Sequence, residues 1–460
     1  MKTRIEKDTL GERRVPASAY YGIQTLRALE NFPVSGLRAH PSLVRAYAEV
    51  KRACAVANRE CRALDARRAR AIVRACDEVV AGALAGQFVV DVYQAGAGTS
   101  FNMNVNEVLA NRALERLGRR RGDYAALHPN DHVNMSQSTN DTFPTALRVA
   151  ALRQTTALCA VLDAFADSLA VKAREFRRVR KAARTHLQDA VPISLGQEFA
   201  AYAAAVRACA SELARRARLL EDVPLGGTAA GTGANTPAGF RRRAVRALAR
   251  STGLALKPAR DMRFGLQSHQ PFTALSGALR ELALELIRIS GDLRLLASGP
   301  VAGLGELRLP AVQPGSSIMP GKSNPALLEG LSMLCFQAVG RDLSVGLAAQ
   351  AGQLDLNVMT PLTAYDLLDT MGLFLNFLPS VEERCLRGIE ADAARCRANA
   401  ERTPSLAALL NPRIGYARAA DVFKDALRRG RGVRDLVLER GLLSAREFDE
   451  LTDPYLREKP

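Results

Sequence analysis

Residues 315–325 read Gly-Ser-Ser-Ile-Met-Pro-Gly-Lys-Ser-Asn-Pro, and this stretch places hydroxyl, ammonium and amide groups on a loop hinged by glycine and proline. The next segment, 326–339, consists of helix formers with apolar side chains near helical spacing. We expect Asn324 to cap that helix and Pro325 to occupy its first position, where an N–H would be unpaired anyway. The Lys322 ammonium and the free amides of the helix start would then converge, so the stretch predicts an anion site.

Two plainer interpretations of the loop compete with this one. A serine-rich loop before a helix is often only a connection. The tripeptide Gly321-Lys322-Ser323 also resembles the end of a phosphate-binding loop, but that motif has four residues between its glycines. Gly315 and Gly321 are separated by five residues, so we do not expect a nucleotide here.

The same stretch resembles the signature loop of the aspartase/fumarase superfamily. Those enzymes eliminate ammonia, water or an amine from succinyl-type substrates and release fumarate. The resemblance covers nearly the whole chain and includes the segments Arg4-Ile5-Glu6-Lys7-Asp8, Ala19-Tyr20-Tyr21-Gly22 and Val437-Leu438-Glu439-Arg440-Gly441-Leu442-Leu443. Together these motifs are specific for the superfamily and less specific for its aspartate ammonia-lyase branch.

Length and composition bound the class of protein. The chain has 460 residues, enough for two or three domains with a large core. Apolar residues make up 48%, but no run reaches the roughly 18 residues of a membrane span, so we expect no membrane partner. The start, Met1-Lys2-Thr3-Arg4-Ile5-Glu6-Lys7, lacks the apolar core of a secretory signal.

Cysteine and histidine usage argues against disulfides and metals. The eight cysteines form no C-x-x-C pair, and most lie among alanines in helical patterns, as do Cys54, Cys61, Cys209 and Cys335. We therefore expect buried thiols in the reducing cytoplasm, with no disulfide framework and no metal site. Among the five histidines only His128 and His132 stand close together, and no C-x-x-C pair accompanies them, so we do not expect zinc either.

The formal net charge of +17 raises the question of nucleic-acid binding. Basic residues are scattered in short clusters, aromatic residues make up only 5%, and tryptophan is absent. Because no basic stripe alternates with stacking side chains, we expect a solvated arginine-rich surface and no nucleic-acid partner. Only nine of the 64 basic residues are lysine, so the lysine at 322 is less likely than an arginine to be a chance surface charge.

Helical periodicity dominates the chain. Apolar side chains recur at three- and four-residue spacing over 41–62, 66–85, 143–180, 194–220, 271–298, 325–350 and 361–388. Strand signals are few and short, as at Phe88-Val89-Val90-Asp91-Val92. The pattern predicts a mainly α protein with a central bundle of long helices.

The resemblance implies a three-domain aspartase/fumarase-like fold. Its domains would be an N-terminal mostly helical domain over 1–138, a central long-helix bundle over 139–393 and a small C-terminal helical domain over 394–460. Long alanine-rich helices leave apolar faces that one chain cannot cover, which predicts self-association. The resemblance implies a homotetramer with a shared helical core and active sites built from three chains.

Two segments of the first half carry candidate substrate contacts. In Gly96-Ala97-Gly98-Thr99-Ser100, glycines before a helix start leave amides exposed beside two hydroxyls. In Ser138-Thr139-Asn140, three short polar side chains beside helix amides suit carboxylate binding, although either segment could be an ordinary cap. The resemblance implies that both segments bind substrate and that Asn140 faces the amino group. Ser100 and Thr139 match aspartases, whereas fumarases usually have Gln and Ser there.

A third segment is Arg184-Thr185-His186-Leu187-Gln188. A lone histidine is more often structural than catalytic, and its interest comes from the resemblance. The resemblance implies that Glu329 meets His186, orients it and favours its charged form. Thr185 would donate to a substrate carboxylate. Histidine occurs here in fumarases and in some aspartases, so it does not separate the two.

The loop 315–325 would supply the catalytic base. By the resemblance, Ser316 is the general base, Ser317 binds one carboxylate, and Lys322 and Asn324 hold the other. Removing the weakly acidic C3 proton of aspartate requires the neighbouring carboxylate to accept a second negative charge, as an aci-carboxylate. Hydroxyls and amides already aimed at its oxygens stabilise that state, and a positive field is needed for a serine alkoxide. This chemistry requires no cofactor and no metal.

Two departures from the family pattern limit the assignment. Ser323 replaces an apolar residue, usually Val, between Lys322 and Asn324. The stretch 265–271 also fits poorly, and His269 within it is either substrate-facing or, as we prefer, a surface histidine. Either change could mark an enzyme for a substituted aspartate.

The resemblance therefore implies aspartate ammonia-lyase activity, in which L-aspartate is converted to fumarate and ammonia by anti elimination. A class II fumarase, acting on L-malate, is the alternative within the same chemistry. A lyase for a substituted aspartate is another. A catalytically inactive binding relative is the alternative from a different class, and the intact Ser316, Lys322, Asn324 and His186 argue against it.

Overall fold

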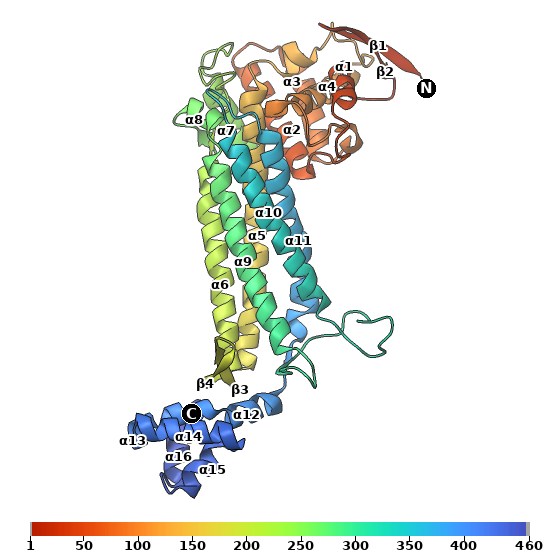
Figure 1. The fold of residues 1–460 in the computed structure, drawn as a ribbon. Coiled ribbons are helices and arrows are strands. Elements are labelled where there is room, and N and C mark those ends of the chain that lie inside the picture. The colour runs from red at the N-terminus through yellow and green to blue at the C-terminus, as the bar shows by residue number, and fades with distance from the viewer. Residues whose placement is uncertain (1, 457–460) are drawn as a thin grey trace. The chain divides into compact units, whose positions relative to one another are not determined.

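A computed structural model describes residues 2–456 of the chain, which are mainly helical (Figure 1). Contacts divide the chain into two units that interleave along the sequence. Unit 1 comprises 1–159, 211–283 and 336–375, and unit 2 comprises 160–210, 284–335 and 376–460. The three predicted domains follow a different division, and their boundaries stay a prediction.

The seven long helices predicted from periodicity are confirmed. They are α2 (Pro41–Glu60), α3 (Ala66–Val80), α5 (Thr139–Glu175), α6 (Leu195–Ala217), α9 (Gln270–Leu296), α10 (Ala326–Gln350) and α11 (Thr360–Arg384). Each unit contains a segment of α5, α6, α9, α10 and α11. Their apolar faces supply most of the core, and their helical spacing explains why the pattern was readable.

Unit 1 also contains strands and helices that belong to it alone. They are β1 (Thr3–Asp8), β2 (Gly11–Pro16), α1 (Ile23–Asn31), α4 (Thr99–Arg116), β5 (Asp222–Val223), α7 (Phe240–Thr252), β6 (Lys257–Pro258) and α8 (Met262–Gln267). The strands β1 and β2 form an antiparallel hairpin, and α2 packs against α3 and α7. A π-helical turn, Pro129–Val133, precedes α5.

The start of α1 is held by a buried carboxylate of α4. Glu107 accepts the backbone N–H groups of Gly22 and Gln24, each at 2.8 Å, and that of Thr25 at 3.1 Å. These amides have no partner within their own helix, so the carboxylate satisfies them. The start of α1 is thereby fixed against the middle of α4, the helix at whose beginning site residues were predicted.

Unit 2 contains two antiparallel strand pairs and the C-terminal helices. The strands β3 (Arg180–Thr185) and β4 (Gln188–Ser194) pair antiparallel, as do β7 (Leu307–Arg308) and β8 (Glu390–Ala391). The remaining helices are α12 (Ala393–Arg402), α13 (Asn411–Ile414), α14 (Tyr416–Arg429), α15 (Val433–Glu439) and α16 (Ala445–Leu456). They enclose a core of their own that includes Leu410, Val422, Val433, Leu436 and Phe448.

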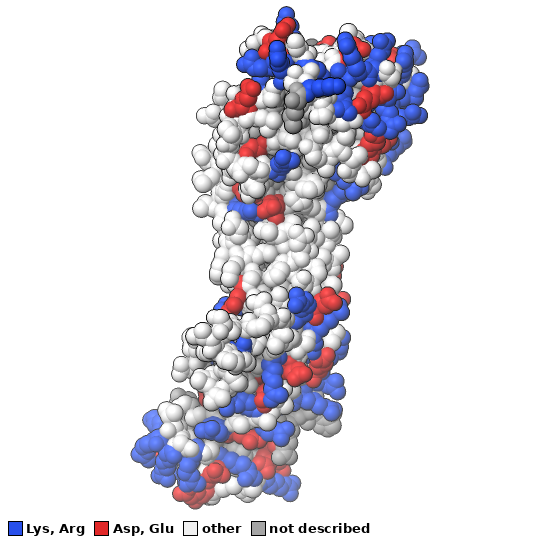
Figure 2. All heavy atoms as spheres, turned by 90° about the vertical axis from the view of Figure 1, so that its right-hand side faces the viewer, with Lys and Arg blue, Asp and Glu red and all other residues white. Residues whose placement is uncertain are grey.

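One face of α10 in unit 1 is exposed and uncharged. Phe336, Leu343 and Leu347 are 60%, 66% and 60% exposed, and the exposed positions between them are Gln337, Gly340 and Gly346. Figure 2 shows a broad area with few charged side chains on the side where α10 and α11 lie. Large exposed apolar side chains gathered on one helix face mark a surface that another protein covers.

The strand expected at residues 88–92 is not present as such. Asp91 forms only an isolated bridge with Arg38. Its carboxylate instead accepts the backbone N–H groups of Ser35 and Gly36 at 2.8 Å and of Tyr93 at 2.9 Å. The Asp91 side chain thus binds backbone N–H groups that would otherwise be free to pair in a β-sheet, and the chain bends there.

Burial of the named cysteines differs from the expectation in two cases. Cys54 and Cys335 are buried, whereas Cys61 and Cys209 are half-buried. None of the helices among residues 2–456 is long and apolar enough to cross a bilayer.

Candidate functional site

A cavity of about 490 Å³ in unit 1 brings together four of the predicted site residues, Thr99, Ser138, Thr139 and Asn140. Its other lining residues are Gln24, Asn102, Met103, Asn134, Ser136, Gln137, Thr228, Ala229, Ala234 and Asn235. Ser100 is largely buried and does not line this cavity. The wall consists mainly of hydroxyls and carboxamides, which can donate hydrogen bonds to a small anion.

The beginning of α5 is held in place by the buried carboxylate of Asp141. Its Oδ1 accepts the Ser138 N–H at 3.0 Å, and its Oδ2 accepts the N–H groups of Gly226 and Thr228 at 2.9 and 3.0 Å. Burial raises the pKa of Asp141 to about 6, against these hydrogen bonds, which lower it. Asp141 thereby joins two stretches that both line the cavity.

The carboxamide of Asn140 has a defined orientation. Its Nδ2 donates to the carbonyl oxygen of Ala229 at 2.9 Å, and its backbone N–H donates to Ser138 Oγ at 3.2 Å. Because a carbonyl can only accept, the nitrogen must face Ala229. The Asn140 Oδ1 accepts no hydrogen bond from residues 2–456 and is left as an acceptor on a cavity-lining side chain.

Sequence reasoning missed Lys51, which lies directly behind this cavity. Its ammonium donates to Asn102 Oδ1 at 2.7 Å, Asn134 Oδ1 at 2.9 Å and Gln137 Oε1 at 3.0 Å. It also lies over the ring of Tyr47, 5.5 Å from the centroid. Lys51 is wholly buried, and burial lowers its pKa to about 7. The available signal was a rare lysine among the apolar and alanine-rich positions of 41–62.

The predicted anion loop belongs to unit 2 and closes on itself. Asn324 Nδ2 donates to the carbonyl of Gly315 at 2.7 Å, and the Gly315 N–H donates to the carbonyl of Lys322 at 2.8 Å. The expectation that Asn324 caps the helix is wrong, because α10 begins at Ala326 and the Asn324 side chain bridges the ends of the loop instead.

Within that loop, Ser316 Oγ accepts two backbone N–H groups, from Ile318 at 3.2 Å and Met319 at 3.0 Å. Ser317 and Lys322 are exposed, as is Ser323, the departure from the family pattern. Lys322 forms no ion pair with residues 2–456, so its charge is available to a ligand.

The β3–β4 hairpin presents Thr185 and His186. The two strands are joined by the two-residue turn His186-Leu187, and both turn residues have positive φ, of 58° and 57°. Such a turn matches the twist of a hairpin, but a branched residue such as Leu187 rarely adopts this conformation. Thr185, His186 and Leu187 are all exposed, so the hairpin tip is available for contact.

The expected pairing of His186 with Glu329 does not occur within one chain. The described ion pair of Glu329 is with Arg294, at 3.9 Å. Both residues belong to unit 2, and no contact between them is present among residues 2–456. Their pairing stays a prediction for an assembly of chains.

His269 is buried, so the preference for a surface histidine is wrong. Its ring nitrogens lie 3.4 Å from Thr360 Oγ1 and 3.3 Å from Thr363 Oγ1. Burial, with a contribution from the nearby Arg148, lowers the pKa of His269 to about 4. It does not line the cavity described above, and it acts as a neutral packing residue between helices.

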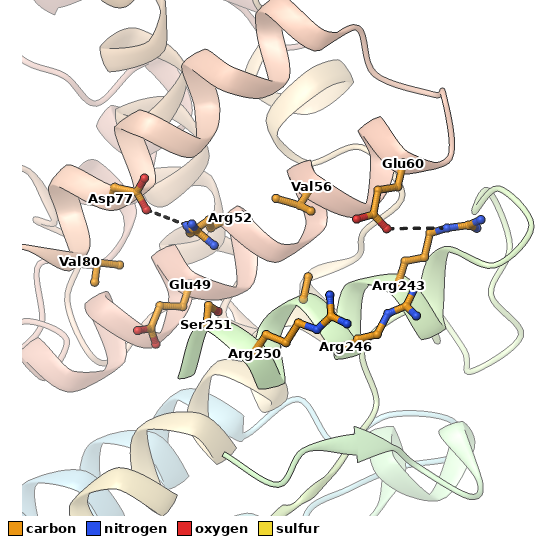
Figure 3. A pocket seen from close by; sticks show the side chains of 11 residues that line it. Glu49, Arg52, Val56, Glu60, Asp77, Val80, Arg243, Arg246, Arg250 and Ser251 are labelled. Carbon is orange, nitrogen blue, oxygen red and sulfur yellow. Dashed lines mark hydrogen bonds and ion pairs between the residues drawn. The ribbon is translucent and has the colours of Figure 1, made fainter. Parts of the chain in front are cut away.

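A second cavity of unit 1, also of about 490 Å³, lies between α2, α3 and α7 (Figure 3). In its wall, Arg52 pairs with Asp77 at 2.7 Å and Arg243 lies 3.8 Å from Glu60. None of the residues predicted from the sequence lines it. Within residues 2–456, no group of three or more His, Cys, Asp or Glu side chains could hold a metal ion.

Comparison with known proteins identifies the family. The chain matches the family model described as Lyase over residues 11–340 and the one described as Fumarase C C-terminus over residues 406–456. It is 48% identical over 455 residues to an aspartate ammonia-lyase of Pseudomonas aeruginosa, covering 98% of this chain and 96% of that one. It is also 45% identical over 448 residues to a class II fumarate hydratase of Thermosynechococcus vestitus, covering 97% and 96%.

A solved structure agrees with these sequence matches. The crystal structure of a fumarate lyase:delta crystallin from Brucella melitensis superimposes with a TM-score of 0.96 at 49% identity, covering both chains completely. Family match, identity and fold all extend over nearly the full length. The protein therefore belongs to the aspartase/fumarase family of lyases, whose members act on dicarboxylates such as fumarate.

Proposed function

We propose that the protein is an aspartate ammonia-lyase, which eliminates ammonia from L-aspartate to give fumarate in a reversible anti elimination. Several relatives at 44–48% identity carry that name. The proposed reaction removes a proton from C3, passes the electron pair into the neighbouring carboxylate as an aci-carboxylate, and then expels ammonia from C2 as the double bond forms.

The observation that carries this proposal is the orientation of Asn140. Its nitrogen is committed to the Ala229 carbonyl at 2.9 Å, so the oxygen remains to accept. A substrate ammonium group has donors and no acceptor, which makes a fixed carbonyl oxygen its natural partner. The neighbouring hydroxyls of Ser138 and Thr139, at the beginning of α5, suit the carboxylate beside that ammonium.

The base in this proposal is Ser316. A neutral serine hydroxyl is a poor base and needs a positive environment to act as an alkoxide. The amides of Ile318 and Met319 already donate to Ser316 Oγ, so they would stabilise negative charge on that oxygen. Lys322 would add a full positive charge from the same loop. Ser317, Lys322 and Asn324 would hold the second carboxylate.

The remaining proposed contacts come from the hairpin and α10. Thr185 would donate to a substrate carboxylate, and His186, oriented by Glu329, would lie beside it. Thr99, at the start of α4, would complete the pocket around Asn140, and the buried Ser100 would lie behind it. We propose that these groups meet in a homotetramer, with each site taking residues from three chains, in the cytoplasm.

The uncharged face of α10 supports the proposed assembly. Burying exposed side chains such as Phe336 and Leu343 against a second copy stabilises association by about 25 cal/mol per Å². A homo-oligomer of closed symmetry presents the same face from every chain, so one such stripe serves all copies.

The alternative is a class II fumarase, which the relative of that name at 45% identity favours. Ser100 and Thr139 argue against it, because fumarases usually carry Gln and Ser at these positions. A substituted aspartate as substrate is the third candidate, and Ser323 in the loop is the residue that favours it.

The decisive experiment offers L-aspartate and L-malate separately to the purified protein and follows fumarate by its ultraviolet absorbance. We expect fumarate from aspartate alone. Turnover of malate alone would make the protein a fumarase. Turnover of neither would direct the search to substituted aspartates.

A further inference from the structure

We propose that Lys51 is a positioning residue of the dicarboxylate pocket, whose buried ammonium orients the carboxamides of the pocket floor and supplies positive charge behind the bound dianion. This inference rests on the proposed function, because it assumes a dicarboxylate in the cavity lined by Thr99 and Asn140. It assigns a role to a residue that does not itself touch the substrate.

The Lys51 ammonium holds three carboxamides of the cavity wall together. An ammonium group has three donors and no acceptor, and Lys51 uses them on three carboxamide oxygens at 2.7–3.0 Å. The three oxygens belong to Asn102, Asn134 and Gln137, which come from two separate stretches of sequence and all line the cavity. Lys51 does not line it, so it acts through them.

Without the ammonium, the hydrogen bonding of the pocket floor would change at Gln137. The Asn102 Oδ1 would keep the Tyr47 hydroxyl as a donor at 3.2 Å, and the Asn134 Oδ1 would keep Asn102 Nδ2 at 3.3 Å. The Gln137 Oε1 would have no donor left among residues 2–456. An unsatisfied acceptor away from water is unfavourable, so the Gln137 side chain would rotate and change the shape of the pocket wall.

The Lys51 ammonium has no counter-charge in direct contact. Among residues 2–456, no carboxylate lies within ion-pair distance of it, and the more distant Asp141 raises its pKa only against the larger effect of burial. A buried cation with no ionic partner is unfavourable unless a nearby anion compensates it. A dicarboxylate bound in the adjoining cavity would supply that negative charge and would in turn be attracted by the cation.

The groups around Lys51 leave it as the main source of positive charge there. From its own helix Tyr47 and Cys54 face it, from α3 Cys76, and from α5 Asp141. Burial raises the pKa of Tyr47, Cys54 and Cys76, so these three remain uncharged at neutral pH. Because burial lowers the pKa of Lys51 to about 7, an anion in the pocket would favour its protonated form.

The test measures binding of succinate, a dianion with no leaving group, by calorimetry on the full-length protein. The variant is Lys51→Met, which keeps the volume and removes the charge. The matched control is Lys172→Met, which removes another buried lysine, paired with Glu175 at 2.7 Å. We expect the succinate Kd and the aspartate KM to rise at least about tenfold in Lys51→Met, with kcat less affected, and neither to change in the control.

The outcomes distinguish a failure of the proposed function from a failure of the role of Lys51. A parent protein that neither binds succinate nor releases fumarate from aspartate overturns the proposed function and this role with it. A parent that does both, together with a folded Lys51→Met variant of unchanged succinate affinity, overturns the role of Lys51 alone.

Should Lys51→Met not fold, the His186→Gln variant replaces it, so that no imidazole lies in the proposed site. Its succinate affinity should fall as the pH rises from about 7 to about 9, where Asp141, with a pKa of about 6, is already ionised and the buried Lys51, with a pKa of about 7, loses its proton. An affinity that stays constant over the range overturns the proposal.

Discussion

Asp141 accepts a hydrogen bond from the backbone N–H of Thr228 at 3.0 Å, and this bond ties the beginning of α5 to a loop almost ninety residues away. Thr228 has a φ of 56°, a region that β-branched residues rarely adopt. The same carboxylate oxygen also accepts the N–H of Gly226. One buried side chain therefore holds a strained loop against Ser138, Thr139 and Asn140.

This buried carboxylate predicts a pH dependence of stability. The pKa of Asp141 is raised from about 4 in the unfolded chain to about 6 in the folded one. A raised folded-state pKa means that its contribution is complete below about pH 4 and is lost as the pH rises through about 6. We expect a loss of about 2 kcal/mol of unfolding free energy from this group between pH 4 and pH 7.

Urea denaturation of the parent and of Asp141→Asn at both pH values measures that contribution. Asparagine does not titrate, so the difference between the two proteins should shrink toward neutral pH. If the difference in unfolding free energy between the two proteins were the same at both pH values, Asp141 would ionise as freely in the folded chain as in the unfolded one.

Ser316→Ala should lower kcat by at least about 100-fold, the low end of the effect of losing a positioned base. The hydroxyl is on an exposed loop, so the fold should survive, and circular dichroism checks it. Ser323→Ala in the same loop is the matched control and should keep kcat within about threefold, since Ser323 has no proposed role as base. Activity within tenfold of the parent would remove Ser316 from the base role.

Lys322→Ala should raise the KM for aspartate strongly. The lost charge-assisted contact with a carboxylate is worth about 2–3 kcal/mol. Lys257→Ala is the control, because Lys257 is also an exposed lysine. It belongs neither to the loop 315–325 nor to the wall of the cavity around Asn140. Steady-state kinetics on both variants provides the comparison, and an unchanged KM in Lys322→Ala would mean that this ammonium points elsewhere.

Asn140→Leu keeps the approximate shape of the side chain and removes its carbonyl acceptor. We expect kcat/KM for aspartate to fall at least about tenfold, the loss of one hydrogen bond to a charged group. Affinity for succinate, which has no amino group, should fall much less. An equal loss for both ligands would assign Asn140 to a carboxylate and not to the ammonium.

Leu343→Glu should dissociate the proposed tetramer, because it places four charges in the apolar faces that α10 would bury. Sedimentation velocity of the parent and the variant measures the change. Val301→Glu is the control, since Val301 is 89% exposed and belongs to a loop of unit 2 outside α10. A parent that sediments as a monomer would contradict the assembly outright.

Long helices were the part of the fold most accessible from sequence. The pattern over 41–62 predicted α2 within two residues of its observed end at Glu60, because helical hydrogen bonds join residues that are near neighbours. The short strand expected at 88–92 failed for a reason outside that pattern. There the Asp91 side chain accepts hydrogen bonds from the backbone N–H groups of Ser35 and Gly36. These residues are far away in sequence, so the pattern of apolar residues around 88–92 cannot predict the contact.

The sequence by itself determined the family, the helical class and the chemical types gathered in the loop 315–325, because each depends on residues in fixed local order. Tertiary structure alone decided that Lys51 lies behind Asn102 and Gln137, that His269 is buried, and which way the Asn140 carboxamide turns. Those facts depend on contacts between distant segments. Such contacts form only when burial of the whole core brings the segments together, and that cooperative free energy is not carried by any single stretch of the chain.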